Sequence, residues 1–166
     1  MSRTSVVIVF LFLAATVLAQ GNGERGGDPH AFRVVDRDGK LVGYSVSDNI
    51  VAREIDKLWV SFYLHSATGI FDSEAVYVYF ATADCTGTRH LPRYRVWLEG
   101  VRVGSQLYYP TDCFEMSPRS VRVVTERTDY DTACHVITDV WSYFFGPVAS
   151  VEVGSFGLQP PFRVMQ

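Results

Sequence analysis

The strongest constraint on the fold is a series of short runs of β-branched and aromatic residues, interrupted by glycine, proline and aspartate. Such residues favour extended backbone, and short strands at this spacing are typical of antiparallel sandwiches and barrels. The sequence therefore predicts an all-β fold, either a single antiparallel sandwich or an open barrel. The runs that we expect to form strands are 32–36, 40–46, 58–64, 75–80, 94–98, 106–109, 120–126, 134–138 and 148–153.

The first two runs flank the tripeptide Arg37-Asp38-Gly39. An Asp-Gly step between β-rich segments is the strongest short-range signal for a hairpin, so we expect one across residues 32–46. Signals for helices are few, because only the short windows 49–57 and 139–145 combine mixed polarity with few helix-breaking residues. We expect one short helix at most. Two prolines before Phe162 predict an extended edge segment that packs on the core through its aromatic residues.

The first nineteen residues have the order of a secretory signal peptide, with Arg3 on a short polar lead, an apolar run over 6–13 and small residues up to Ala19. The apolar run is about half of the roughly 20 residues that a membrane span requires. Val17 and Ala19 place small side chains where a signal peptidase reads them. We therefore expect cleavage before Gln20, a secreted or periplasmic product, and no membrane span in the mature chain.

Domain organisation and charge follow from the rest of the chain. Residues 20–31 are rich in glycine and polar side chains and should form a flexible N-terminal lead. Residues 32–166 have the size of one ordinary domain, with no internal repeat, so we expect a single β domain. The whole chain carries 15 basic and 18 acidic side chains. Because Arg3 lies in the leader, the mature chain keeps 14 basic groups and a formal charge of −4, which does not favour nucleic acid as a partner.

Three cysteines, Cys85, Cys113 and Cys134, are an odd number for an oxidising compartment. They predict one disulfide together with either one remaining thiol or an intermolecular pair. In the chain-entropy model a bridge from Cys85 to Cys134 stabilises by about 4 kcal/mol and one from Cys113 to Cys134 by about 3.5 kcal/mol, which is too small a difference to select one. The spacing of cysteine and histidine fits no compact zinc pattern, so we expect neither a metal site nor a cofactor.

The most distinctive local segment is 79–87, YFATADCTG, in which a strand runs into a turn that carries a cysteine. Asp84 is suited to accept backbone N–H groups across the turn, Gly87 to adopt a positive φ, and Cys85 to anchor the turn to a neighbouring strand. We interpret this segment as architectural, because a catalytic thiol needs a nearby base and a reduced sulfur.

The chain resembles a group of small secreted bacterial proteins that combine a hairpin like VVDRDGKLVG, a turn like YFATADCTG, a strand like LYYP and an end like PPF. The matching pieces are residues 34–43, 79–87, 107–110, Cys134 and 160–162. The resemblance implies a β-rich fold, and it implies a bridge between the turn cysteine and the late cysteine, which would pair Cys85 with Cys134. It implies no activity, since the shared motifs are turn and core residues.

Catalytic signatures are missing from the sequence, which contains neither G-x-S-x-G nor H-E-x-x-H. The run 75–80 points instead to binding. Side chains two residues apart on a strand share a face, so Tyr77 and Tyr79 should line one face of this strand. The other face, with Val76, Val78 and Phe80, is the better core. The two tyrosines are therefore candidates for an exposed aromatic surface.

Exposed aromatic rows stack on sugar rings or form protein contacts. Seven arginines lie between residues 88 and 127, and together on one face they would attract an anionic glycan. We expect a secreted, non-catalytic binding or structural module whose ligand is a surface glycan or a protein, with Tyr77, Tyr79, Arg93 and Arg95 as candidate binding residues. A secreted hydrolase or a peptidase inhibitor is the alternative. A cleft with a converged histidine and carboxylate would favour the enzyme, and an exposed rigid loop would favour the inhibitor.

Overall fold

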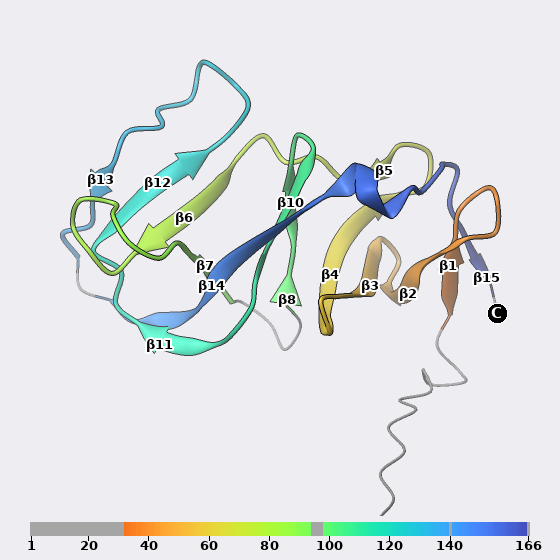
Figure 1. Ribbon diagram of the computed structural model, residues 1–166, viewed down its shortest axis with the longest axis horizontal. Helices are drawn as coiled ribbons and strands as arrows, with labels where there is room; N and C mark the ends of the chain where they lie inside the picture. Colours follow the sequence, from red (N-terminus) through yellow and green to blue (C-terminus); the bar gives the residue numbers. More distant parts are fainter. Residues whose placement is uncertain (1–31, 94–97, 140, 166) are drawn as a thin grey trace, which may run out of the picture.

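The computed structural model describes residues 32–93, 98–139 and 141–165. These residues form two sheets, antiparallel apart from one parallel pair, in a sandwich-like arrangement, and the predicted all-β fold is confirmed (Figure 1). Within the described ranges the only helical element is the 3-10 turn η1 (Val153–Phe156). The predicted signal peptide 1–19, the lead 20–31 and most of the predicted strand 94–98 lie outside the described residues.

The first sheet places the first and the last described strands side by side, in the order β15-β1-β2-β3-β4-β5, with β8 added in parallel beside β4. Its strands are β1 (Arg33–Val35), β2 (Leu41–Ser47), β3 (Ile50–Ile55), β4 (Leu58–His65), β5 (Gly69–Ile70), β8 (Leu98–Glu99) and β15 (Arg163–Met165). The edge segment predicted after the two prolines is strand β15, and Phe162 beside it is buried in the core.

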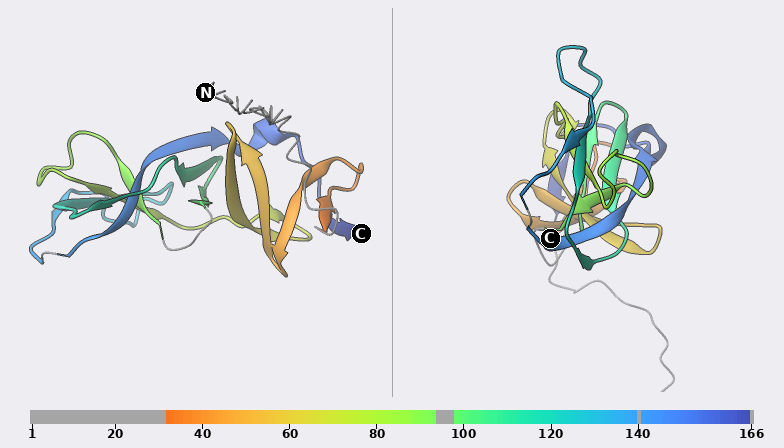
Figure 2. Two further views of the ribbon diagram at one scale, coloured as in Figure 1. Left: turned by 90° about the horizontal axis from the view of Figure 1, so that it is seen from below. Right: turned by 90° about the vertical axis from the view of Figure 1, so that its left-hand side faces the viewer.

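The second sheet has the order β13-β12-β6-β7-β14-β10-β9, with β11 paired to β14. Its longest strand, β14, extends from this sheet towards η1 and the first sheet, as Figures 1 and 2 show. Its strands are β6 (Val76–Phe80), β7 (His90–Pro92), β9 (Val101–Val103), β10 (Gln106–Pro110), β11 (Phe114–Met116), β12 (Ser120–Val124), β13 (His135–Val136) and β14 (Tyr143–Glu152).

The predicted first hairpin is present as the pair β1–β2, and Gly39 takes the left-handed backbone with a φ of 82°. Its turn is organised by Asp36, which is only 1% exposed. The Asp36 carboxylate accepts N–H groups from Lys40 at 2.8 Å, Asp38 at 3.0 Å and Gln159 at 3.1 Å. Burial raises the pKa of this carboxyl, but the three N–H donors outweigh burial and lower its pKa below the usual range.

Neither window considered for a helix forms one among its described residues. Residues 50–55 are strand β3, and Tyr143 begins strand β14. Tertiary pairing decides the first case, because β3 has β2 on one side and β4 on the other and buries Val51 and Ile55. The two neighbouring strands form hydrogen bonds with the backbone of β3, and this pairing outweighs the weak local preference for a helix.

Two hydrophobic clusters lie on opposite sides of strand β10. Leu107 and Tyr109 join the first cluster, where they pack with the inner side of the first sheet and with Phe156. Tyr108 points the other way and packs against the second cluster. That cluster contains Val76, Val78 and Phe80, 1–5% exposed, as the alternation of strand β6 predicts. Strand β10 therefore contributes side chains to both clusters.

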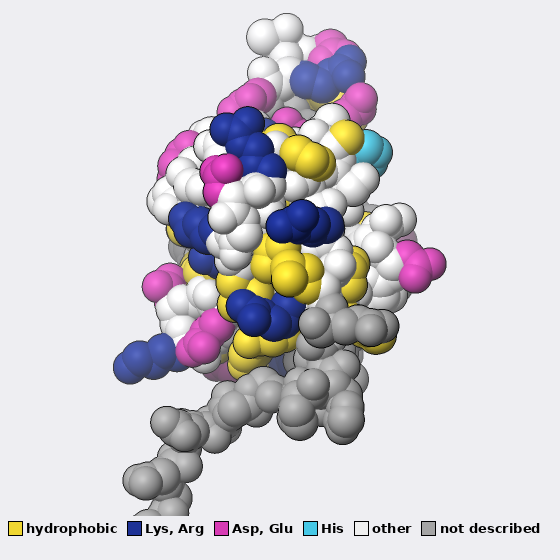
Figure 3. Space-filling model, turned by 90° about the vertical axis from the view of Figure 1, so that its right-hand side faces the viewer, with side chains coloured by type: hydrophobic (Ala, Val, Ile, Leu, Met, Phe, Trp, Pro, Cys, Tyr) yellow, Lys and Arg dark blue, Asp and Glu magenta, His cyan; other side chains and the backbone are white. Residues whose placement is uncertain are grey.

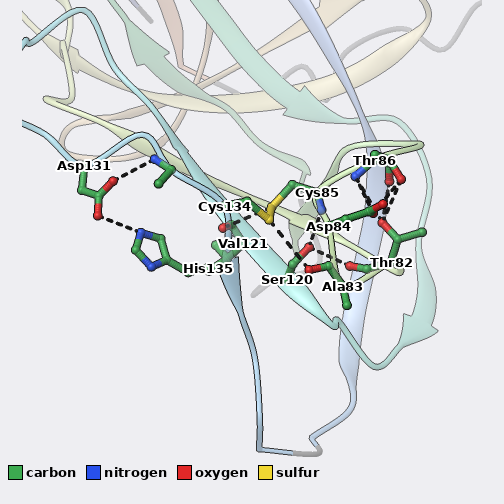
Figure 4. The surroundings of a disulfide bond; sticks show 11 residues. Thr82, Ala83, Asp84, Cys85, Thr86, Ser120, Val121, Asp131, Cys134 and His135 are labelled. Atoms are coloured by element: carbon green, nitrogen blue, oxygen red, sulfur yellow. Dashed lines mark hydrogen bonds and ion pairs between the residues drawn. A yellow bond between two sulfur atoms is a disulfide. The ribbon is translucent and has the colours of Figure 1, made fainter.

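The turn after β6 has the geometry expected from its sequence (Figure 4). Asp84 accepts the N–H of Thr86 at 3.2 Å, and both Gly87 and Cys85 have positive φ, at 87° and 55°. Cys85 forms a disulfide with Cys134, with a Cα–Cα distance of 5.8 Å, and its N–H donates to the Ser120 hydroxyl at 3.0 Å. The turn is thus anchored to β12 and to the start of β13, and Cys113 is a free, half-buried cysteine.

Candidate functional site

An aromatic surface covers the outer side of the second sheet, away from the second cluster. Residues directly opposite each other on antiparallel strands point to the same side. Tyr79 lies opposite both Val121 and His90, and Phe145 lies opposite Phe114. We call this surface the aromatic face and define it, together with the contacting Trp141, as Tyr77, Tyr79, His90, Pro92, Phe114, Met116, Val121, Val123, His135, Trp141, Tyr143, Phe145 and Pro147.

The rings of the aromatic face contact one another around Phe145, which is fully buried. The Phe145 ring centroid lies 5.2 Å from that of Tyr79, 5.9 Å from that of Trp141 and 6.4 Å from that of Tyr143. The Tyr79 and Trp141 rings are 6.0 Å apart, edge to face. Because Trp141 and Tyr143 remain 39% and 36% exposed, the cluster has a buried base and an accessible top.

The structure places Tyr77 and Tyr79 beside Pro92 at the end of β7, and the candidate Arg93 is the next residue along the chain. Tyr77 is 53% exposed and Tyr79 is half-buried. Both line a groove of about 240 Å³ that also reaches Pro92. The half-buried Arg93 follows Pro92, and its backbone N–H donates to the Phe144 carbonyl at 2.8 Å. Arg95, the fourth candidate, lies outside the described residues.

The paired positions of the aromatic face hold no lysine, arginine, aspartate or glutamate, and the basic residues there are His90 and, on the edge strand β13, His135. His90 is 7% exposed, stands edge to face on Phe114 at 5.4 Å, and its Nδ1 has no hydrogen-bond partner in the described structure. Burial lowers the pKa of this histidine, although the backbone of Tyr79 and Thr88 opposes the shift. The His90 imidazole is therefore neutral at physiological pH, and the centre of the face carries no charge there.

Three of the arginines between residues 88 and 127 are located by their pairing. Arg102 pairs with Asp72, and Arg122 lies opposite Val78, on the inner side of the sheet. Arg127 pairs with Glu74 at 2.9 Å and with Asp129 at 2.6 Å, and these carboxylates raise its pKa. These three arginines therefore have separate surroundings and do not line one surface.

The loop between β12 and β13 projects from the molecule, as the right-hand view of Figure 2 shows. Its contacts to Glu74 come from Arg127, at 2.9 Å, and from the Tyr130 hydroxyl, at 2.7 Å. His135 and Asp131 form an ion pair at 3.1 Å, but their side chains are 50% and 66% exposed. This histidine–carboxylate pair lies on an open surface and not in a cleft.

Among the described residues, no group of histidine, cysteine and acidic side chains is arranged to hold a metal ion. No helix in the described part of the chain is both long and apolar enough to cross a membrane. Comparison with protein-family models, with curated proteins and with solved structures finds no match to this chain.

The sequence pattern identified Tyr77 and Tyr79 but not the rings of β14 and the segment before it. Trp141, Tyr143 and Phe145 fall in the window that was considered for a helix. Their alternation, with an aromatic residue at every second position, is a strand signal that this short window contains. Phe114 offers no local signal, because only its register opposite Phe145 places it on the face.

Proposed function

We propose that this protein is an exported, non-catalytic binding domain that docks onto a protein partner through the aromatic face of its second sheet. One observation carries the proposal: exposed aromatic rings in mutual contact stand on a sheet face whose paired positions hold no lysine, arginine, aspartate or glutamate, only the buried His90 and, on the edge strand, His135. Contiguous apolar surface of this kind on a soluble protein marks an interaction site.

The chemistry of the aromatic face favours a protein over a glycan. The centres of protein interfaces are enriched in tyrosine, tryptophan, phenylalanine and methionine and depleted in lysine, glutamate and aspartate. Sugar hydroxyls need several polar partners beside the aromatic rings. The paired positions of the aromatic face hold tyrosine hydroxyls but no carboxylate, amide or guanidinium, and Glu99 is the one carboxylate that lines the adjoining groove. Arg93 at its margin fits the role of an arginine anchor in a protein interface.

Two features support a location outside the cytoplasm. Residues 1–19 have the pattern of a signal peptide, and Cys85 and Cys134 form a disulfide. Disulfides persist in secreted and periplasmic proteins and are rare in the cytosol. A partner in the same compartment would therefore bind the folded domain with its Cys85–Cys134 disulfide already formed.

The proposal is tested by site-specific photo-crosslinking in the producing cells. A benzophenone amino acid replaces Tyr77 on the aromatic face or, as the control, Tyr63, which is 43% exposed on the first sheet. We expect one protein to cross-link from position 77 and not from position 63. Binding of that purified partner should weaken about 30-fold when Trp141 is changed to Ala, the effect of an interface hot spot.

Two results would contradict the proposal. The first is the same set of adducts from positions 77 and 63, because the face would then have no specific partner. The second is a protein adduct whose affinity does not change in the Trp141→Ala and Tyr77→Ala variants. A polysaccharide cross-linked specifically from position 77 would show that the ligand of the aromatic face is a glycan and not a protein.

A further inference from the structure

The groove beside the aromatic face opens where strands β6 and β7 separate. In the described part of the chain the two strands pair at Tyr79 opposite His90 and at no further position. Two residues further on, the ladder would place Tyr77 opposite Pro92, but a proline has no N–H group to donate. Tyr77 and Pro92 instead both line the groove that lies between the diverging strands.

The side chain of Glu99 faces this groove from the end of strand β8. Successive residues of an extended segment point to opposite sides. Leu98 belongs to the first cluster, and a Cβ added to Gly100 would stand 3.0 Å from Cγ1 of Val60 in the same cluster. Glu99 and Val101 therefore point the other way, and both line the groove. We call it the Glu99 groove.

The Glu99 carboxylate is half-buried and has no partner among the described residues, either in an ion pair or in a hydrogen bond. The described residues that line the groove include no lysine, arginine or histidine. Its walls are mainly apolar, from Val76, Leu91, Pro92 and Val101. A carboxylate that is partly withdrawn from water without a partner is costly, so a cation brought by a binding partner would be favoured here.

The dimensions and walls of the Glu99 groove suit one long side chain. Its volume of about 240 Å³ is below the roughly 300–1,000 Å³ of small-molecule sites. The ring of Tyr77, which is 53% exposed, is accessible beside it. An arginine has an aliphatic stem for apolar walls and a planar guanidinium that binds a carboxylate through two N–H groups and stacks on an aromatic ring. These three properties match the three kinds of surface in the groove.

The first sheet provides a contrast in charge. Figure 3 shows the side of the molecule with β1, β2 and β15, where a strip of hydrophobic side chains lies between lysine and arginine side chains, and such a surface does not attract a cation. A groove on the outer side of this sheet is lined by Glu54 and by Tyr44 and Trp59, whose ring centroids are 5.8 Å apart. Glu54 is exposed, however, and a carboxylate surrounded by water binds a cation weakly.

We propose that the Glu99 groove receives an arginine side chain of the protein partner, a role that rests on the proposed docking function of the aromatic face. The guanidinium pairs with Glu99 and packs against the ring of Tyr77, and the aliphatic stem lies along the apolar walls. Arginine is enriched among the residues that dominate protein interfaces, and a partly desolvated charge pair determines which partner binds. The aromatic face then supplies contact area, and the Glu99 groove supplies specificity.

The test is an NMR titration of the isotope-labelled mature chain with capped tripeptides that carry arginine, lysine or citrulline between two glycines. Citrulline keeps the shape of arginine and removes its charge. We expect the arginine peptide to bind with a dissociation constant in the millimolar range, as fits a single anchor, and to shift the amide signals of Tyr77, Glu99 and Val101. The citrulline peptide should bind about tenfold more weakly, and the lysine peptide severalfold more weakly, because neither forms the charged two-pronged contact.

Two variants localise the binding. Glu99→Gln keeps the size of the side chain and should abolish the preference for arginine over citrulline. Glu54→Gln makes the same change of charge in the groove of the first sheet and should leave the preference unchanged. The melting temperature of each variant verifies its fold. The proposal is overturned if the arginine peptide shifts none of the three amides, if citrulline or lysine binds as tightly as arginine, or if Glu99→Gln retains the preference.

The titration needs no partner, so its failure is distinct from a failure of the photo-crosslinking experiment. With the cross-linked partner purified, Glu99→Gln should weaken its binding about tenfold and reduce the salt dependence of the affinity. A partner whose affinity falls in Trp141→Ala but not in Glu99→Gln would confirm the aromatic face as the docking surface and overturn the arginine anchor.

Discussion

Most of the buried apolar residues belong to the cluster under the first sheet, whereas the outer side of the second sheet carries a contiguous group of aromatic rings. Among the residues that the structure describes, the first cluster contains 13 buried residues and the second contains 6, one of which is the disulfide-bonded Cys85. A smaller core needs additional stabilisation, and the cross-link to Cys134 supplies it. Because the Cys85–Cys134 disulfide stabilises the second sheet, the exposed aromatic side chains of its outer side are not needed to build the core and are available for recognition.

The largest effect is expected from truncation in the first cluster. Phe62 is 1% exposed, and Phe62→Ala should lower the free energy of unfolding by about 4 kcal/mol, since it removes a ring and leaves a cavity. Phe80→Ala, its counterpart in the second cluster, should cost about 3 kcal/mol because a smaller cluster collapses more readily around the void. Urea denaturation measures both. A larger loss for Phe80→Ala would reverse the proposed order of the two cores.

Removal of the disulfide should affect mainly the second sheet. The double change Cys85→Ser and Cys134→Ser opens a loop with a sequence separation of 49 and should cost about 4 kcal/mol, the value that chain entropy gives for this bridge. Amide exchange should accelerate more in β6 and β12 than in β3 and β4. Cys113→Ser is the matched control and should change neither quantity. Equal acceleration in both sheets would show that the cross-link is not the local support of the second sheet.

A smaller effect, confined to acid, is expected from the first hairpin. The pKa of Asp36 is lowered in the folded protein, so its stabilising contribution is complete above the ordinary value of 3.8 and is lost as the pH falls through the lowered folded value. The Asp36→Asn variant should lack this contribution, so its urea midpoint should fall less between pH 7 and pH 2.5 than that of the wild type. Identical acid profiles would contradict the role of this carboxylate.

The smallest effect on stability is expected from Tyr77→Ala. The side chain is 53% exposed, so its removal should change the free energy of unfolding by no more than about 0.5 kcal/mol. Tyr79→Ala should cost more, about 1–2 kcal/mol, because the Tyr79 ring packs on Phe145 and Trp141. Thermal unfolding of the two variants provides the measurement. A loss of several kcal/mol in Tyr77→Ala would show that this ring belongs to a core.

Features that depend on local pattern were predictable from the sequence. The alternation in strand β6 assigned Val76 and Val78 to the core and Tyr77 to the surface, and the Asp-Gly step located the hairpin turn at Gly39. The pairing of Cys85 with Cys134 followed from a resemblance, since chain entropy alone did not select it.

Features that depend on contacts between distant segments were not predictable. The Asp36 carboxylate accepts an N–H from Gln159, and no local pattern connects these residues. The outer-side partnership of Tyr44 with Trp59 requires the register of three strands, one of which, β3, lies in a window considered for a helix. The same holds for Phe114, which reaches the aromatic face only through its pairing with β14.

The adjacency of β1 and β15 sets an order of events for a chain that crosses a membrane before it folds. Strand β1 pairs with residues 163–165, so its outer edge stays without a partner until nearly the whole chain has emerged. The second sheet and strands β2 to β4 can pair earlier. The pairing of β1 with β15 forms slowly, because the two strands are far apart in the sequence. An exported chain of this topology would therefore depend, for the time between emergence of β1 and arrival of β15, on a chaperone that shields a bare strand edge.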